Sequence, residues 1–402
     1  MIFGKRPFIF LLVILSLVTA ACNLSSGGES PAATATGAGQ APVQTQAPGP
    51  TAEAPAGEQP VEPTAAPTSP PVVAGNYNWS ALDASLASFV PNTVKGLTLI
   101  LARDGQILFL KGYGDQGADT VQTVSTSTEI ASAMAILTLV DEGKLNLDVP
   151  VVSLLSEGYA WPADKAAITM RMLLNHTSGL ISDPPCVRQK SDMILVRCVD
   201  EILNAPLVSA PGSQFAYSSA DYQVAGFVAT EIAQRPTWID FFAERISNPL
   251  GLQIFTYGKE NNAFGSDKNP RISSGVATTV TDFNILLQMF LAGGKFGDRQ
   301  ILSQAVIAEM QTNQVAGVPR VDTPGRDSFT GFSFGWWITD SSQHPGSNGP
   351  ELSAPGNFGS IPWVDLDLRY SGVLLLKERL KSGVDIWNVI RPIIIEELKK
   401  AQ

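Results

Sequence analysis

The 402-residue sequence is poor in the residues that most often bind metals, because it contains only two histidines and three cysteines. His176 and His344 stand far apart and the cysteines show no paired spacing, so we expect neither a zinc site nor another cofactor. The sequence also lacks a run of basic residues, and its formal net charge of −10 argues against nucleic acid as a partner. It contains no Gly-x-Ser-x-Gly motif, which argues against an α/β-hydrolase.

The first 21 residues have the composition of an export signal. Lys5 and Arg6 precede an apolar run at residues 8–18, which is too short to span a bilayer comfortably. The small residues before Cys22 are similar to a bacterial lipobox. We therefore expect residues 1–21 to be a signal peptide and Cys22 to carry the lipid of an extracytoplasmic lipoprotein, anchored to the outer face of the cytoplasmic membrane. The alternative is a secreted protein with an incidental cysteine.

Residues 22–75 are rich in Ala, Pro, Thr and Gly and contain almost no large apolar side chain. Such a segment cannot bury enough apolar surface to offset the entropy lost on ordering. We expect it to be a disordered tether, with one folded domain at residues 76–402.

The two remaining cysteines stand twelve positions apart, at Cys186 and Cys198. Export would place them in an oxidising environment, where a disulfide between them is plausible and Cys22 is left for lipid attachment. The alternative is a pair of buried free thiols.

Strand patterns lie at both ends of the folded part and helical patterns lie between them. An amphipathic helix is predicted at 79–90, strands at 97–102 and 106–111, and a closing helix at 384–399. Asp104 and Gly105 join the first two strands in a strong hairpin signal. Three further strands are predicted at 332–338, 361–364 and 371–376. This order predicts an α/β (α+β) domain with a helical insertion.

The stretch from Val124 to Leu145 contains the most apolar helix of the insertion. Ile130, Met134 and Leu137 recur at helical spacing, alanines and leucines fill the other faces, and the pattern ends at Gly143. A helix that is apolar all round packs inside a domain, so a site could form at its N-terminus.

Two passages after the start of this helix carry a family resemblance. LVDEGKLNLDVPV, which begins at Leu139, and ITMRMLLNHTSGL, which ends at Leu180, resemble the serine hydrolases that include class C β-lactamases, penicillin-binding DD-peptidases and related esterases. The resemblance covers residues 95–376. It implies a β-lactamase/transpeptidase-like fold, with an antiparallel sheet built from both chain ends and flanked by helices. It also implies that a histidine at the place of His176 is more often structural than catalytic.

In that family a Ser-x-x-Lys motif supplies the nucleophile and its base, and counting back from Leu139 places Thr126 and Glu129 at these positions. A hydroxyl is a poor nucleophile until a base removes its proton, and a glutamate is a much weaker base than a neutral lysine. Thr126 and Glu129 also form a capping-box pattern, in which each side chain bonds the other residue's backbone N–H. A purely structural capping role for Thr126 and Glu129 is therefore the alternative to a catalytic role.

The resemblance extends to two further motifs, and both are altered. Tyr217 matches the tyrosine that relays a proton in the β-lactamase branch, whereas Ser219 replaces the asparagine that follows it. A half-buried structural tyrosine is the alternative for Tyr217. The third motif, which carries a substrate-binding cation, falls on Ala354, Pro355 and Gly356, so the cation is missing. His344 could replace it, although its surroundings predict a polar turn.

These replacements predict a protein whose acylation chemistry is lost or strongly reduced, and which serves as a ligand-binding pseudoenzyme. With Glu129 in place of lysine, we expect a more negative cleft that favours a neutral or cationic small molecule or cell-wall ligand over a carboxylate. The rival is an active esterase or amidase that uses Thr126 as nucleophile, Tyr217 as proton relay and backbone N–H groups as oxyanion donors. A third hypothesis is a purely structural envelope protein.

Overall fold

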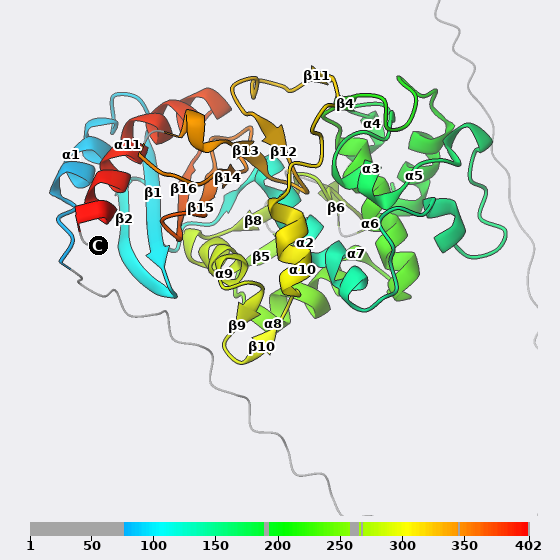
Figure 1. Cartoon of the computed structure of the whole chain (residues 1–402), viewed down its shortest axis with the longest axis horizontal. Coiled ribbons are helices and arrows are strands. Elements are labelled where there is room, and N and C mark those ends of the chain that lie inside the picture. Colours follow the sequence, from blue (N-terminus) through cyan, green and yellow to red (C-terminus); the bar gives the residue numbers. More distant parts are fainter. Residues whose placement is uncertain (1–75, 189–192, 258–264, 267, 345, 401–402) are drawn as a thin grey trace, which may run out of the picture. The chain divides into compact units, whose positions relative to one another are not determined.

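The computed structural model describes residues 76–188, 193–257, 265–266, 268–344 and 346–400 (Figure 1). The predicted signal peptide, Cys22 and the predicted tether lie outside these residues. Within the described ranges, no helix has the length and apolar character needed to cross a membrane.

A seven-stranded antiparallel sheet forms one side of the domain, in the strand order β12-β13-β14-β15-β16-β1-β2 (Figure 1). The central pairing joins the two ends of the chain, because Leu97 of β1 lies opposite Leu376 of β16. The prediction of a sheet built from both chain ends is therefore confirmed. The strands are β1 (Gly96–Arg103), β2 (Gln106–Gly114), β12 (Gly331–Phe332), β13 (Trp337–Thr339), β14 (Glu351–Ser353), β15 (Ile361–Asp365) and β16 (Tyr370–Leu376).

The predicted hairpin at Asp104 and Gly105 is present, with Arg103 paired to Gln106. Both turn residues have positive φ, 49° and 75°, as a two-residue hairpin turn requires. The single strand predicted at 332–338 is wrong, because a tight turn divides this segment into β12 and β13. In that turn the Trp336 N–H donates to the Ser333 carbonyl.

The two faces of the sheet are covered by helices from different parts of the chain. α1 (Ser80–Ser88) and α11 (Leu380–Lys400) cover one face, and α9 (Val280–Leu291) covers the other. Alternate residues of β1 serve the two faces: Leu97, Leu99 and Leu101 pack with the α1 and α11 side, whereas Ile100 belongs to the core cluster that includes α9. Both terminal helices were predicted, although α11 begins four residues earlier than expected.

A helical region lies beside the sheet, with α2 (Thr128–Asp141) in its middle, as predicted for the most apolar helix (Figure 1). Residues 128–139 of α2 are all buried. The other helices are α3 (Met170–Leu174), α4 (Pro185–Arg188), α5 (Leu195–Asn204), α6 (Ser219–Ala233), α7 (Trp238–Phe242), α8 (Asn248–Leu250) and α10 (Gln304–Gln311).

Short strands and single helical turns connect these elements. The short strands are β3 (Gln122–Thr123), β4 (Phe215–Ala216), β5 (Phe255–Tyr257), β6 (Gly265–Ser266), β7 (Asn269–Pro270), β8 (Val276–Thr278), β9 (Lys295–Phe296), β10 (Arg299–Gln300) and β11 (Arg320–Asp322). The helical turns are η1 (Ser125–Ser127), η2 (Val151–Leu154), η3 (Ala163–Lys165), η4 (Ala243–Ser247) and η5 (Ser341–Gln343).

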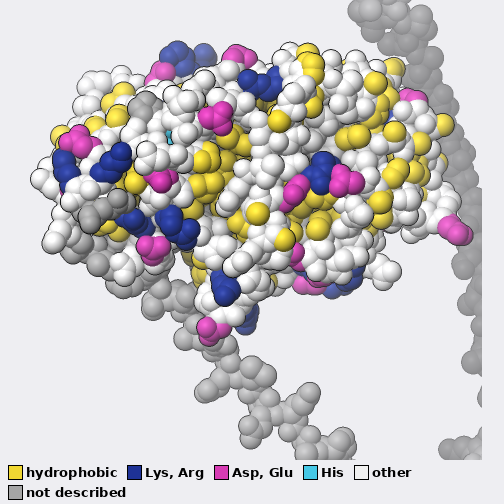
Figure 2. Space-filling view, viewed as in Figure 1, with side chains coloured by type: hydrophobic (Ala, Val, Ile, Leu, Met, Phe, Trp, Pro, Cys, Tyr) yellow, Lys and Arg dark blue, Asp and Glu magenta, His cyan; other side chains and the backbone are white. Residues whose placement is uncertain are grey.

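The predicted disulfide joins Cys186 of α4 to Cys198 of α5, with an S–S distance of 2.10 Å. It fastens two helices of the insertion to each other. On the described part of the face shown in Figure 2, acidic and basic side chains lie interspersed.

Candidate active site at the start of the central helix

Thr126 lies on η1, the turn that leads into α2, and its side chain is half-buried. Its hydroxyl donates to the Pro355 carbonyl at 3.3 Å and accepts from Nη2 of Arg326 at 3.0 Å. The capping-box interpretation is wrong, because the N-cap of α2 is Ser127 and no side chain makes a capping hydrogen bond there. The Thr126 hydroxyl faces the sheet instead, because η1 packs against the segment after β14.

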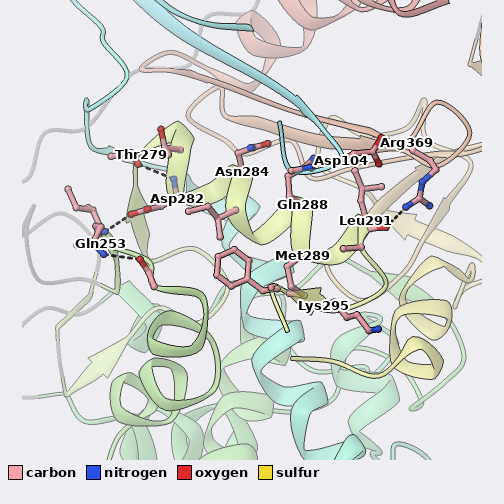
Figure 3. Close-up of a pocket in the computed structure, with 18 of the residues that line it drawn as sticks. Asp104, Gln253, Thr279, Asp282, Asn284, Gln288, Met289, Leu291, Lys295 and Arg369 are labelled. Atoms are coloured by element: carbon pink, nitrogen blue, oxygen red, sulfur yellow. Dashed lines mark hydrogen bonds between the residues drawn. The ribbon is translucent and has the colours of Figure 1, made fainter. Parts of the chain in front are cut away.

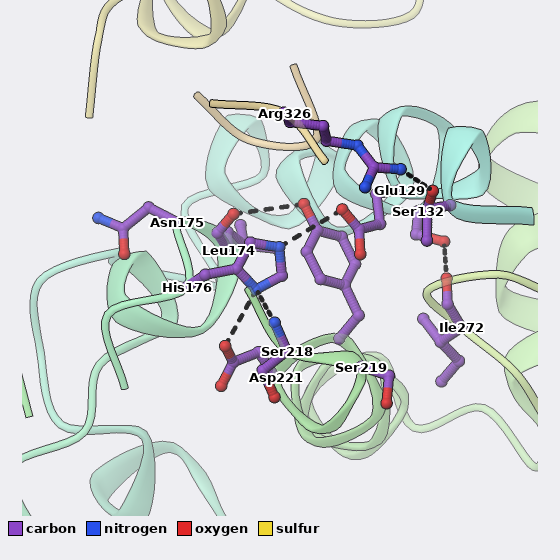
Figure 4. A network of polar contacts seen from close by, with 12 residues as sticks. Glu129, Ser132, Leu174, Asn175, His176, Ser218, Ser219, Asp221, Ile272 and Arg326 are labelled. Carbon is purple, nitrogen blue, oxygen red and sulfur yellow. Dashed lines mark hydrogen bonds and ion pairs between the residues drawn. The ribbon is translucent and has the colours of Figure 1, made fainter. Parts of the chain in front are cut away.

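The carboxylate of Glu129 points toward the ring of His176, in the helical region (Figure 4). The side chain is fully buried, and its Oε2 lies 3.4 Å from Nε2 of His176. Its Oε1 has no hydrogen-bond partner among the described residues. Glu129, which was predicted to stand at the family's lysine position, therefore contacts a histidine rather than the Thr126 hydroxyl.

His176 follows α3 in the left-handed backbone region, with φ of 58°, and its ring lies between two carboxylates. On the side opposite Glu129, Nδ1 lies 3.0 Å from Oδ2 of Asp221, in the first turn of α6 (Figure 4). Burial disfavours the imidazolium, but the charge of Glu129 and the hydrogen bond with Asp221 outweigh it and raise the pKa of His176 to about 9. The raised pKa favours the imidazolium at neutral pH, in which Nδ1 donates to Asp221 and cannot accept from the Ser218 backbone N–H that lies 3.3 Å away. A cation held between two carboxylates agrees with the structural role implied by the resemblance.

Tyr217 lies close to this cluster, with its ring centroid 4.4 Å from that of His176 and 5.4 Å from the guanidinium carbon of Arg326. Burial, and after it the negative charge of Glu129, raises the pKa of the Tyr217 hydroxyl well above its ordinary value. A phenol in this environment stays protonated at neutral pH, so it cannot accept a proton from Thr126.

Ser219 is not brought together with Thr126. Its hydroxyl lies 3.2 Å from the Ser182 carbonyl and 3.4 Å from a carboxylate oxygen of Asp183, on the outer side of the α6 N-terminus. Figure 4 shows it pointing away from Glu129. The predicted substitute for the family's asparagine therefore bonds a loop instead of facing the hydroxyl of Thr126.

The segment Ala354, Pro355 and Gly356 lies directly against η1, as its match to the third motif implied. The Ala354 carbonyl accepts from Oγ of Ser127 at 2.6 Å. The approach is so close that a Cβ on Gly356 would lie 2.3 Å from the Val124 carbonyl oxygen, which makes glycine necessary here.

The backbone of this segment offers no donor to a ligand. The Ala354 N–H donates to the Pro362 carbonyl, the Gly356 N–H donates to the Ser360 carbonyl, and Pro355 has no N–H. An oxyanion hole needs N–H groups aimed at the position of the developing charge. These three residues supply none.

A cation does lie beside the segment that was predicted to be the third motif, but it comes from another part of the chain. Arg326, in the loop between β11 and β12, is 1% exposed. Its Nη2 contacts the Pro355 carbonyl at 2.5 Å and Oδ1 of Asn357 at 3.1 Å, in addition to Thr126. Arg326 belongs to no recognisable motif, so sequence reasoning missed it.

His344 is not the substitute cation of this site. It is fully buried, although a polar turn was predicted, and its Nε2 lies 2.8 Å from Oδ2 of Asp365 and 3.7 Å from Oε2 of Glu351. Glu351 and Asp365 pair at the far end of β14 from Ala354. This alternative is therefore wrong.

The expectation of a more negative cleft also fails, because two cations compensate the carboxylates. Arg326 and the protonated His176 lie in the same cluster as Glu129 and Asp221. Burial lowers the pKa of Arg326, but a guanidinium starts from so high a value that it stays charged. The negative charge of Glu129 is thus offset locally.

The fold and the sequence agree with one known family. The model of the Beta-lactamase family matches residues 84–389, about three quarters of the chain. The chain belongs to the β-lactamase family. It is a β-lactamase-related protein of the serine hydrolase type, and the predicted β-lactamase/transpeptidase-like fold is confirmed.

Individual relatives support this assignment. The chain is 29% identical over 267 residues to Penicillin-binding protein 4 of Amycolatopsis lactamdurans, which covers 60% of this chain and 68% of that protein. It is 22% identical over 348 residues to a putative D-alanyl-D-alanine carboxypeptidase of Escherichia coli O157:H7, which covers 70% of this chain and 77% of that protein.

Solved structures show the same fold. A putative β-lactamase from Bacteroides dorei DSM 17855 superposes with a TM-score of 0.68 at 24% identity and covers 80% of this chain and 99% of that one. The D-amino acid amidase of Ochrobactrum anthropi SV3 superposes with a TM-score of 0.65 at 20% identity and covers 80% of this chain and 98% of that one.

Proposed function

We propose that the chain is a non-catalytic member of its family, an extracytoplasmic lipoprotein whose domain binds a ligand without hydrolysing it. The proposal is carried by one observation: the Thr126 hydroxyl bonds to the Arg326 guanidinium and to a backbone carbonyl. A guanidinium has no lone pair with which to accept a proton, and an amide carbonyl is a very weak base. Neither partner can activate the hydroxyl.

The neighbouring groups do not supply the missing base. The Tyr217 hydroxyl interacts with both Thr126 and Glu129, but the phenol remains protonated. Glu129, beyond it, is held by the His176 imidazolium. Removal of a nucleophile or base in a serine hydrolase lowers the rate by about 10⁴-fold to 10⁶-fold, and such losses do not add, because the groups act together. A threonine hydroxyl without a base should restore little of this lost catalytic rate.

Arg326 also restricts access to Thr126. The guanidinium is buried against Tyr217 and Trp337, with ring distances of 5.4 and 5.7 Å, and it bonds to three oxygen atoms around Thr126 and Pro355. Thr126 is itself half-buried, so the Arg326 side chain narrows the approach to its hydroxyl.

The test is intact-mass analysis and peptide mapping after incubation with a fluorophosphonate, which labels activated hydroxyls. We expect no adduct on Thr126 in the folded protein, and none in an Arg326→Ala variant, since removal of the blocking side chain does not create a base. Thr126→Ala is the matched control for labelling elsewhere.

An adduct on Thr126 that disappears in Thr126→Ala would contradict the proposal and favour an esterase or amidase that acts through Thr126. An adduct that appears only in Arg326→Ala would also contradict it, because the hydroxyl would then be competent but blocked.

The proposal of a lipid anchor is based on the sequence near the N-terminus. Cys22 follows small residues and an apolar run, and the disulfide between Cys186 and Cys198 fits an oxidising compartment. We expect the protein to fractionate with membranes and a Cys22→Ser variant to be released. Membrane association that persists in Cys22→Ser would refute lipidation at this residue.

A further inference from the structure

A cavity of about 600 Å³ lies along α9, and its lining includes none of the residues around Thr126 (Figure 3). Its volume lies within the range of about 300 to 1,000 Å³ that is usual for sites of small ligands. Apolar side chains form its floor, among them Ile254, Ile285, Met289 and Phe296. A ligand with an apolar middle would remove this surface from water.

The wall of the cavity is already fixed by hydrogen bonds within the protein. Gln288 of α9 donates to Oγ of Ser371 at 2.7 Å and to the Ala102 carbonyl at 3.2 Å, and it accepts from the Gly105 N–H at 2.7 Å. Its amide therefore ties α9 to β1, β16 and the hairpin turn. Because these groups are paired without a ligand, the cavity is preformed, which lowers the cost of binding.

Charges of opposite sign lie at the two ends of α9. Asp119 and Asp282 line the cavity at the start of the helix, and Lys295 and Arg369 line it at the end. Asp282 is buried and its carboxylate accepts from the Ile254 N–H, so Asp119 is the acidic group open to a ligand. Figure 3 shows Asp282 on one side of the view and Lys295 and Arg369 on the other. Asp119 and Lys295 are exposed and have no ion-pair partner among the described residues. One acidic residue, Asp104, lies at the positive end beside Arg103.

The separation of these charges indicates the length of the ligand. Asp282 and Leu291, whose carbonyl accepts from Arg369, are nine positions apart on one helix, which corresponds to about 13 Å. An extended peptide of about four residues spans this distance. Its amino terminus would lie near Asp119, and its carboxylate near Lys295 and Arg369.

We propose that the α9 cavity binds a short linear peptide with free ends and apolar central side chains. The proposal goes beyond the function proposed above and does not depend on it, because it holds whether or not Thr126 is reactive.

The test is calorimetric titration of the full chain with the free peptide Ala-Leu-Leu-Ala. Two capped forms are titrated beside it: one acetylated at its amino terminus, which removes the positive charge, and one amidated at its carboxyl terminus, which removes the negative charge. We expect the free peptide to bind, and removal of either terminal charge to weaken binding by about tenfold or more. No binding up to about 5 mM, or equal binding of free and capped peptides, would overturn the proposal.

Two pairs of exposed residues provide matched variants. Lys295→Glu should weaken binding by about tenfold, whereas Arg299→Glu, on the same β-hairpin but outside the cavity, should leave it unchanged. Asp119→Lys should also weaken binding by about tenfold, whereas Asp115→Lys, outside the cavity, should leave binding unchanged. Equal effects within a pair would show a general charge effect and would also overturn the proposal.

Discussion

Two regions of this protein differ in how their polar groups are paired. In the Thr126 corner, which comprises Thr126, Glu129, Tyr217, Arg326 and Pro355, the charged side chains are buried and held by the protein itself. In the α9 cavity, four charged side chains are exposed on the rim around an apolar floor: Asp104, Asp119, Lys295 and Arg369.

The comparison shows that the region predicted from the family resemblance is not the region whose charged groups are open to a ligand. The Thr126 corner is where the sequence predicts the family's active site, but opening it would leave the Arg326 cation without the oxygens that bind it. Burying or unpairing a charge costs several kcal/mol. The α9 cavity carries no such cost, because Asp119 and Lys295 are exposed and have no ion-pair partner to lose among the described residues. Family position alone therefore does not show where a ligand binds.

The largest expected effect comes from removing the cation between the two carboxylates. His176→Phe leaves Glu129 and Asp221 buried without their shared partner, so we expect the free energy of unfolding to fall by about 3 to 5 kcal/mol. Lys295→Ala at the rim of the α9 cavity should change it by less than about 0.5 kcal/mol. Urea denaturation measures both values. A loss below about 1 kcal/mol in His176→Phe would show that the corner is not held by this ion pair.

The same histidine predicts how stability depends on pH. The pKa of His176 is about 9 in the folded protein and about 6.5 when unfolded, so the stabilisation is complete below about pH 6.5 and is lost as the pH rises through about 9. The pKa difference corresponds to about 3 kcal/mol. We expect urea midpoints to fall between these pH values in the wild type and much less in His176→Phe. The same fall in both proteins would assign it to another group.

A smaller effect is expected from two glycines with positive φ, one in each region. A Cβ on Gly335 (φ 80°) would lie 2.7 Å from the backbone of Glu129 and Ile130, whereas a Cβ on Gly297 (φ 56°) at the cavity meets nothing within 4 Å. Gly297→Ala carries only backbone strain, about 1 kcal/mol, and Gly335→Ala adds a steric clash and should cost about 2 to 4 kcal/mol. Thermal unfolding of both variants tests this order. Equal losses would show that α2 can shift to accommodate the methyl group.

Much of the fold could be predicted because it follows from local patterns. The apolar spacing from Ile130 onward predicts a buried helix, and Asp104 with Gly105 predicts a hairpin, since each depends on residues close in sequence. The strand β14 was missed, because three residues are too few for a periodic pattern to emerge.

The candidate site could be predicted only in part. Counting from Leu139 located Thr126 and Glu129, and the Ala354 segment was correctly placed against them. The direction in which Glu129 points was not predictable, since either its own helix terminus or His176, 47 positions away, could have bound it. A choice between a local and a distant partner depends on how the elements pack.

The sequence by itself therefore determined the family and the order of the elements, because both are encoded in neighbouring residues. It also predicts that the serine and lysine positions are replaced. Only the tertiary structure decided that Arg326 binds the hydroxyl of Thr126, 200 positions away in the sequence. It also decided that the side chains of Asp119 and Lys295 line one cavity. Such contacts arise when distant segments pack together, and no local pattern records them.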